Sequence, residues 1–410
     1  MMGSGTECTV RQVSSEWLRI GRRLLYVEPW MAEANARGDV FLAGRYNYLG
    51  ELDSVGHWHP IGQDGDILGA YLPHDGPPRI VASPFPEIRV GTIRAVPDGP
   101  RSWFVVFVEA VQKPNGLPSD SAKALWSGRY DGSRWSQLER LPVPSGAVFW
   151  SEQGASLVRR ADTLIWAVVK KPGYGLLMFQ RQANRWTFTE NRVFLADADV
   201  HSGEELVLGV VQADPAIAEG DGNSLLLWTR RPTWQILHTV VPGRRERVYR
   251  PSIREYRNRS IITWQTPNQT DDRGGWEMHA MVAADPSVES PVFIVDSVNS
   301  GSRPETPVFM ADGRPLWITD HRGPDGIAQI QFAVYDPATG SSEVRARFAN
   351  PFVTPFMPVV LPDRDVLISG AHYENQSYVV SVLQRYRLRC AERTAARSPG
   401  LTPIPGIRHP

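Results

Sequence analysis

The 410-residue sequence has little of what marks several specialised protein classes. Two cysteines are too few for a disulfide framework, and 44 basic against 44 acidic side chains leave none of the basic excess that nucleic acids and anionic membranes select. No apolar run approaches the roughly 20 residues of a transmembrane helix. We therefore expect neither nucleic acid nor a membrane as a partner.

Several functional motifs are also missing. The sequence has no GxSxG nucleophile elbow and no HExxH zinc motif, and its glycine-rich turns lack the strand-to-helix context of a phosphate loop. His57 and His59 alternate in one segment and could share a metal, but no cysteine or acidic cluster accompanies them at ligand spacing. We predict no metal site and no cofactor.

Both ends lack recognisable structural or targeting signals. The N-terminal residues show neither the apolar stretch nor the small-residue cleavage site of a secretory signal, so the sequence as written predicts a cytoplasmic protein. A misassigned or trimmed N-terminus would instead make the protein secreted. Residues 391–410 are rich in Pro and Arg without periodicity, and we expect them to form a tail without regular structure.

The sequence is rich in turn formers and large aromatics, with 35 Gly, 34 Pro and 14 Trp, a composition that suits many short strands. Short apolar runs recur about every 50–60 residues, the length of one four-stranded unit. We place these inner-strand repeats near residues 41, 104, 164, 225, 261, 316 and 366; the runs read VFLAGR, WFVVFVE, LIWAVVK, LLLWTRR, IITWQT, PLWITDH and VLISGAH. Most of the runs have a shorter apolar segment before them, and a hairpin follows each run.

This pattern predicts an all-β fold, a single seven-bladed β-propeller of four-stranded antiparallel blades over residues 1–390. The alternative, a tandem of β-sandwiches, would need a linker every 100–120 residues, and none is visible. The seventh repeat lacks its last strand, and CTVRQVS or RRLLYVEP near the N-terminus is available to close the ring. Closure would bring Cys8 near Cys390, either as a disulfide or as two free thiols.

In such a blade, the start of the innermost strand and the end of the second strand lie on one rim. Asp320 and His321 end one second strand, and His372 and Tyr373 end the next. A histidine beside a carboxylate and a phenol is a suitable acid/base set, so we predict these four residues as catalytic, against the alternative of ordinary surface residues.

The same rim holds candidate substrate-binding residues. Arg250 and Arg303 begin the inner strands of adjacent blades, where two guanidiniums would hold a carboxylate or sulfate by bidentate hydrogen bonds. Alternatively, each pairs with a neighbouring acid such as Glu305 or Asp320. We add Arg45 and Glu152 from the same rim to the predicted binding set.

The motif RPETPVFMADGRPLW (303–317) and the hairpin YDGSRW (130–135) resemble the repeats of the sialidase-like propellers, a superfamily with BNR-type repeats that includes polysaccharide lyases. The match departs from the family's Asp box, Ser-x-Asp-x-Gly-x-x-Trp, because Asp131 and Gly132 are adjacent, and the amino-terminal Arg-Ile-Pro motif is missing. The resemblance implies that Arg250 and Arg303 stand where two of the family's three carboxylate-binding arginines lie.

The resemblance also implies a carbohydrate-active enzyme, a lyase or glycoside hydrolase that acts on an anionic saccharide in the central funnel. In the lyases of this group, Arg neutralises a uronate carboxylate and Tyr or His removes the C5 proton. Two alternatives remain: a non-catalytic propeller that binds a glycan or other ligand, and an intracellular enzyme that acts on a small metabolite. We expect a monomer whose partner is a saccharide or other small molecule.

Overall fold

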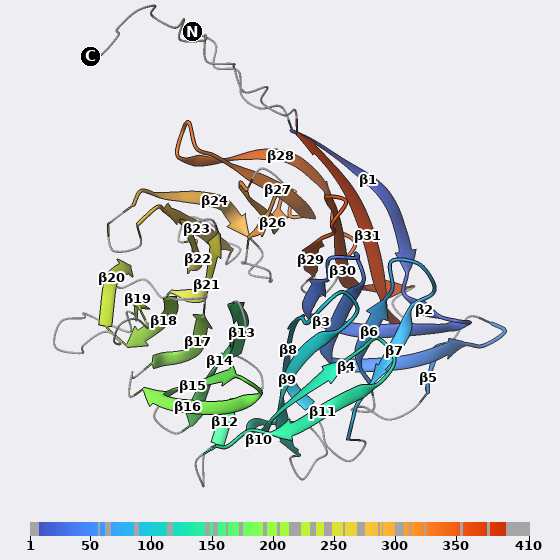
Figure 1. Cartoon of the computed structure of the whole chain (residues 1–410). Helices are drawn as coiled ribbons and strands as arrows, with labels where there is room; N and C mark the ends of the chain where they lie inside the picture. Colours follow the sequence, from blue (N-terminus) through green and yellow to red (C-terminus); the bar gives the residue numbers. More distant parts are fainter. Residues whose placement is uncertain are drawn as a thin grey trace, which may run out of the picture.

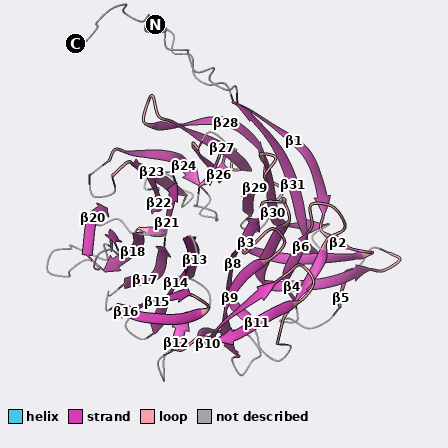
Figure 2. Cartoon of the chain, viewed as in Figure 1, coloured by secondary structure: helices cyan, strands magenta, loops and turns pink. Residues whose placement is uncertain are grey.

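A computed structural model describes much of the chain. The described residues are 8–55, 58–61, 67–85, 90–112, 118–143, 148–150, 155–160, 163–171, 175–191, 195–202, 206–212, 223–229, 235–241, 248–256, 259–268, 275–285, 288, 290–299, 307–310, 313–323, 325–352, 356–374 and 378–390. They form strands, turns and loops, without helix (Figure 2). This part of the chain therefore offers no helix of the length and apolarity that a membrane crossing needs.

The described strands form seven antiparallel units of four strands, the blades of a propeller, with each blade's first strand nearest the axis. Blade 1 contains β3 (Arg23–Ala34), β4 (Val40–Leu52), β6 (Ile67–Leu72) and β7 (Arg79–Ala82). Blade 2 contains β8 (Val90–Pro97), β9 (Trp103–Gln112), β10 (Pro118–Tyr130) and β11 (Trp135–Arg140). Blade 3 contains β13 (Ala155–Arg160), β14 (Thr163–Lys171), β15 (Gly175–Gln182) and β16 (Arg185–Asn191).

The remaining blades repeat this order. Blade 4 contains β17 (Leu195–Ser202), β18 (Leu206–Gln212), β19 (Asn223–Thr229) and β20 (Gln235–Val241). Blade 5 contains β21 (Tyr249–Tyr256), β22 (Arg259–Pro267), β23 (Trp276–Ala283) and β24 (Val292–Asn299). Blade 6 contains β25 (Val308–Phe309), β26 (Pro315–Arg322), β27 (Ala328–Asp336) and β28 (Ser341–Ala349). Blade 7 contains β29 (Met357–Val360), β30 (Asp365–Glu374), β31 (Tyr378–Cys390) and β1 (Cys8–Trp17).

Three short strands lie outside this scheme: β2 (Arg19–Ile20) pairs with β3, β5 (Trp58–Ile61) with β4, and β12 (Val148–Trp150) links β10 to β14. The first strands of successive blades contact one another around the ring, from β3 through β8, β13 and β17 to β21, and from β25 through β29 back to β3. Figure 1 shows the blades arranged around a common centre. The predicted seven-bladed propeller is confirmed.

The apolar runs that mark the repeats occupy the same place in most blades. Six of them form the second strand of a blade, because that strand is buried on both faces and needs apolar side chains at consecutive positions. The run that starts at Leu225 is different, since it forms β19, the third strand of blade 4. The second strand there is β18, which begins at Leu206, and this explains the irregular spacing of the repeats around residue 225.

The ring closes as predicted, with an N-terminal strand as the outermost strand of the last blade. Of the two candidate segments, CTVRQVS provides it: β1 pairs antiparallel with β31, with Cys8 opposite Cys390 in the register. Cys8 is disulfide-bonded and buried, and Cys390 is the only other cysteine in the sequence. The two ends of the propeller are thus joined by a strand pairing and a covalent bond.

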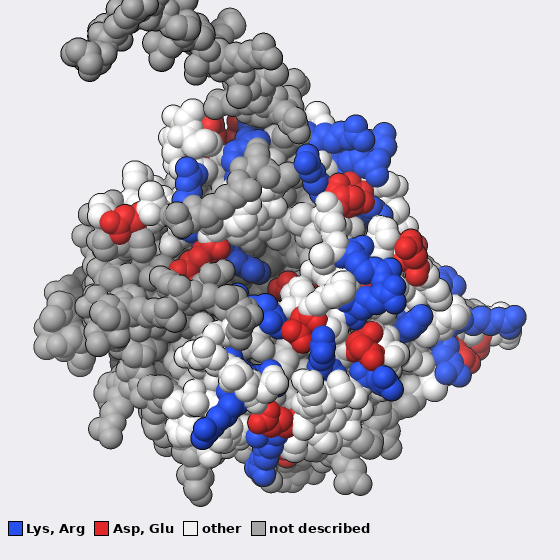
Figure 3. Space-filling view, viewed as in Figure 1, with Lys and Arg blue, Asp and Glu red and all other residues white. Residues whose placement is uncertain are grey.

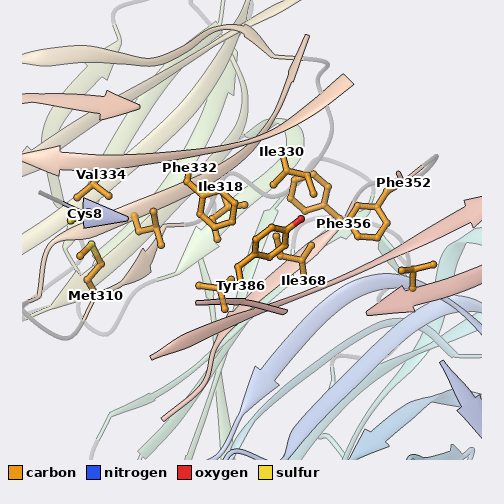
Figure 4. Close-up of a cluster of buried hydrophobic side chains, with 13 residues drawn as sticks. Cys8, Met310, Ile318, Ile330, Phe332, Val334, Phe352, Phe356, Ile368 and Tyr386 are labelled. Carbon is orange, nitrogen blue, oxygen red and sulfur yellow. The ribbon is translucent and has the colours of Figure 1, made fainter. Parts of the chain in front are cut away.

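Apolar clusters fill the seams between blades. Strand alternation places Phe41 and Ala43 of β4 in the cluster with blade 2, and Val40 and Leu42 in the cluster with blade 7. Figure 4 shows the cluster between blades 6 and 7, where Phe332 and Tyr386 lie with ring centroids 5.1 Å apart. Burial of these seams on both faces of each blade is the main source of stability in the fold.

Candidate active site

The predicted catalytic residues lie at the rim where second strands end. At this rim, the chain that leaves the outermost strand of one blade crosses over the second strand of the next. Asn299, which ends β24, pairs with His321 of β26, and Phe149 of β12 pairs with Lys170 of β14. The space-filling view in Figure 3 shows a hollow at the centre of the ring, with Lys or Arg and Asp or Glu side chains near it.

A buried histidine and carboxylate meet in the seam between blades 5 and 6. His321 Nδ1 lies 2.8 Å from Asp296 Oδ1, and the Thr319 hydroxyl donates a hydrogen bond of 2.7 Å to Asp296 Oδ2. All three side chains are buried, and His321 is 7 % exposed. Both carboxylate oxygens are therefore occupied, and the imidazole ring is held in one orientation.

This arrangement determines which ring nitrogen of His321 can exchange protons. Asp296 accepts a hydrogen bond from the Nδ1–H of His321, and no described residue hydrogen-bonds to Nε2. A carboxylate on one nitrogen selects the tautomer and stabilises the imidazolium that forms when the other nitrogen takes a proton. His321 is consequently suited to act as a general base or acid through Nε2.

Further polar groups line the same seam and connect the two blades. The Gln331 amide donates to the carbonyl of Val295 at 3.3 Å, and Arg347 Nε donates to Gln331 Oε1 at 2.8 Å. Gln331 is paired with Thr319 in the β26–β27 register, so this chain of hydrogen bonds lies directly beside the strand that carries His321. Cross-blade hydrogen bonds of this kind hold Asp296 at a fixed distance from His321.

The seam between blades 6 and 7 holds two other predicted residues. Asp320 Oδ1 accepts a 2.8 Å hydrogen bond from the Asn350 amide, and His372 Nδ1 lies 2.6 Å from the carbonyl oxygen of Pro351. Asn350 and Pro351 follow β28 directly, so one short segment contacts both side chains. Asp320 is buried and His372 is half-buried.

The structure corrects the predicted pairing of Asp320 with His321. Consecutive residues of a strand point to opposite faces, so His321 faces blade 5 while Asp320 faces blade 7. The carboxylate that contacts His321 is Asp296, from the outermost strand of the preceding blade. The described contacts of His321 and His372 lie in different seams, and a shared catalytic role for the two remains a prediction.

Arg250 occupies an irregular position at the same rim. It follows Tyr249 at the start of β21, where the register with β22 shifts, and its φ angle is 51°. A left-handed conformation is unfavourable for a residue with a Cβ atom and tends to occur at functional sites. Arg250 is half-buried there, and its role in binding remains a prediction.

The other predicted site residues are outside what the structure describes. Arg303 and Glu152 lie outside the described residues altogether. Arg45 and Tyr373 belong to strands β4 and β30, but their side chains are not among those described. Their roles remain predictions. His57 is also outside the described residues, and His59 contacts Asp53 at 3.1 Å.

Asp296 and Thr319 are functional candidates that were not predicted from the sequence. Thr319 stands two residues before His321, the spacing that puts both on one face of a strand, and this signal was readable. Asp296 precedes His321 by 25 residues and belongs to another blade, so only the packing of blade 5 against blade 6 brings the two together.

Neither a family model nor a curated protein matches this sequence. Among solved structures, the chain is similar to an α-L-arabinanase from Penicillium chrysogenum complexed with arabinobiose, with 14 % identity, a TM-score of 0.46, and coverage of 72 % of this chain and 93 % of that one. It is also similar to the WD40 domain of SCAP from fission yeast, with 10 % identity, a TM-score of 0.42, and coverage of 91 % and 97 %.

A third similar structure is the Trypanosoma rangeli sialidase, with 10 % identity, a TM-score of 0.39, and coverage of 76 % of this chain and 56 % of that one. These similarities concern the path of the chain.

Proposed function

We propose that this propeller is a carbohydrate-active enzyme that acts on an anionic saccharide, with His321 as its proton-transfer residue. The observation that carries the proposal is the buried Asp296–His321 pair at the rim of the central funnel. The resemblance of the blade repeats to sialidase-like propellers supports a saccharide as the substrate. Arg250, in its unusual backbone conformation at the same rim, is the candidate for binding a carboxylate of that substrate.

Of the two reaction types, the described groups favour elimination over hydrolysis. Glycoside hydrolysis generally needs two carboxyl groups that flank the scissile bond. Here Asp296 already accepts two hydrogen bonds and Asp320 accepts one from Asn350. In an elimination, His321 Nε2 would take the C5 proton of a uronate, and the C4–O bond would break as the C4=C5 bond forms. The departing oxygen would then take a proton from the imidazolium or from water.

The experiment is a screen for turnover on uronate polymers, read by the ultraviolet absorbance of the unsaturated uronate product, beside a panel of fluorogenic glycosides. We expect the absorbance to rise with at least one uronate polymer. His321→Ala should lower kcat by about 10²–10⁴-fold, the usual contribution of a general acid or base. Asp296→Asn should lower kcat and shift the pH profile, because the amide no longer stabilises the imidazolium.

His74→Ala is the matched control. His74 is half exposed in the β6–β7 hairpin at the opposite rim, and its removal should leave turnover unchanged. Full activity of His321→Ala in a folded protein would contradict the proposal. Activity on the glycoside panel alone would identify a hydrolase instead of a lyase.

A second candidate function is glycan binding without catalysis. The observation that favours it is that the described contacts of His321 and His372 lie in two different seams. Tight saccharide binding with no turnover, in wild type and in His321→Ala alike, would support this function. The disulfide of Cys8 supports action in an oxidising compartment, in line with the secreted alternative.

A further inference from the structure

A glutamate and an arginine face each other across the centre of the ring. Glu33 lies on β3 of blade 1 and Arg254 on β21 of blade 5, and these blades are not neighbours. Even so, Glu33 Oε1 is only 3.9 Å from Arg254 Nη2. The central channel at this level is therefore narrow enough for two side chains from opposite walls to meet.

The two groups are accessible and incompletely satisfied. At 3.9 Å they form an ion pair but no hydrogen bond, and neither is hydrogen-bonded to any other described residue. The side chains of Glu33 and Arg254 are 31 % and 47 % exposed, so water in the channel reaches both. Enclosure by protein raises the pKa of Glu33, and the charge of Arg254 only partly opposes this effect.

We propose that Glu33 and Arg254 form a second binding site in the channel, for a small ligand that carries both a carboxylate and hydroxyl groups, such as a hexuronate. The guanidinium would bind the ligand carboxylate, because its planar donors match both carboxylate oxygens. The Glu33 carboxylate would accept hydrogen bonds from ligand hydroxyls. The choice of an acidic sugar rests on the proposed function, whereas the pairing of the two side chains does not.

This site is separate from the rim that holds His321. Arg254 lies five residues after the start of β21, roughly 15 Å along a strand, and Glu33 is the last residue but one of β3. Both positions are near the rim opposite to the ends of the second strands. A ligand here would not contact His321, so the channel site would bind acidic sugar independently of the reaction.

The test is a titration of sodium D-glucuronate into the whole protein by calorimetry, with D-glucose as the ligand that has hydroxyls but no carboxylate. We expect wild type to bind glucuronate and not glucose. Arg254→Gln should weaken glucuronate binding about tenfold or more, the value of a charged hydrogen bond. Glu33→Gln should strengthen it, because the amide still accepts a hydroxyl while the negative charge is gone.

Arg23→Gln provides a matched control. Arg23 forms an ion pair of 2.6 Å with Glu51 and is 47 % exposed, as Arg254 is, but it is the first residue of β3, at the other end of the strand from Glu33. Its glucuronate affinity should equal that of wild type, and thermal unfolding should show that all variants fold. The proposal is overturned if wild type does not bind glucuronate, or if folded Arg254→Gln binds it as wild type does.

The same titration with His321→Ala separates the two proposals. We expect this variant to bind glucuronate with wild-type affinity. If no polymer is turned over but binding still depends on Arg254, then the channel site stands and the proposed reaction fails. If turnover depends on His321 while Arg254→Gln binds glucuronate normally, then the reaction stands and the channel site fails.

Discussion

Single aspartates hold many of the turns on the rim opposite to the candidate active site. Asp131 Oδ1 accepts hydrogen bonds from the backbone N–H of Arg134 and from the hydroxyl and backbone N–H of Ser133, and these contacts lower the pKa of Asp131 to about 2. In the YDGSRW hairpin, Asp131 therefore caps the turn although the motif does not match an Asp box. Asp39 acts similarly, accepting from the backbone N–H of His74.

Asp365, the first residue of β30, is buried and has two arginine partners. Arg385 Nε and Arg387 Nε donate to it at 2.7 and 3.2 Å. Burial alone would raise the pKa of Asp365, but the hydrogen bonds and charges of Arg387 and Arg385 outweigh it and lower the pKa. The stabilisation is therefore complete above the unfolded-state pKa of about 3.9 and disappears as the pH falls through the lower folded-state value.

We predict that Asp365→Asn lowers the free energy of unfolding by about 2 kcal/mol at neutral pH, because two charged hydrogen bonds to partly exposed arginines are weakened. The variant should also lose less stability than wild type on acidification below about pH 4. Urea unfolding at several pH values measures both effects. Asp75→Asn is the control, since Asp75 is 82 % exposed and should change stability by less than about 0.5 kcal/mol. Parallel acid curves for wild type and Asp365→Asn would contradict the assignment.

At the scale of elements, close contacts between a strand and the segment that links two blades determine where site residues lie. Gly370 in β30 has no side chain, and a Cβ atom there would collide with the ring of Phe352. Phe352 follows Pro351, whose carbonyl contacts His372. The glycine thus allows the ring of Phe352 to pack directly against the backbone of β30. This close approach also places the neighbouring Pro351 carbonyl in contact with His372.

We predict that Gly370→Ala destabilises the protein by about 1–3 kcal/mol, the usual cost of overpacking, by displacing Phe352. In a Phe352→Ala background the same change should cost much less, because the colliding ring is gone. Urea unfolding of the four proteins in this double-mutant cycle gives the coupling energy. Equal effects of Gly370→Ala in both backgrounds would show that Phe352 is not the obstacle.

The indole nitrogens of two equivalent tryptophans show how neighbouring blades are joined. Trp135, the first residue of β11, donates to the carbonyl of Ala82 in blade 1, and Trp186 of β16 donates to Ser127 in blade 2. Both residues follow a tight turn in the last hairpin of their blade, and each indole reaches back to the preceding blade. The repeat in the sequence is thus also a repeat of blade-to-blade contacts.

At the scale of the whole molecule, the ring is held closed by β1, which begins at Cys8 and pairs with β31 along its length. The disulfide of Cys8 joins residues that are separated by nearly the whole propeller. In the chain-entropy model, such a long loop stabilises the folded state by roughly 6 kcal/mol, by restricting the unfolded chain, whereas disulfides typically contribute about 2–4 kcal/mol.

We predict that Cys8→Ser lowers the free energy of unfolding by about 4 kcal/mol. Cys390→Ser and the double variant should show the same loss, because each removes one and the same bond. Urea unfolding with and without reductant tests this: reductant should bring wild type to the level of the variants and leave the variants unchanged. An additive effect of the two substitutions, or no effect of reductant on wild type, would refute the prediction.

The sequence by itself determined the architecture of this protein. Apolar runs such as WFVVFVE and PLWITDH, repeated about every 50–60 residues with turn residues between them, can bury both of their faces only in stacked four-stranded sheets. The missing strand of the last repeat likewise indicated closure by the N-terminus, since an open edge would be left otherwise. The run at Leu225 forms the third strand of its blade, unlike the other runs, because apolar character alone does not indicate which strand of a blade a run forms.

Only the tertiary structure decided which polar groups meet. His321 and Asp320 are neighbours in sequence, yet the alternation of a strand sends them into different seams. Asp296 reaches His321 from another blade, and Glu33 meets Arg254 across the centre of the ring. Contacts of this kind depend on the angle and distance between packed blades, which the local pattern of side chains along the chain does not encode.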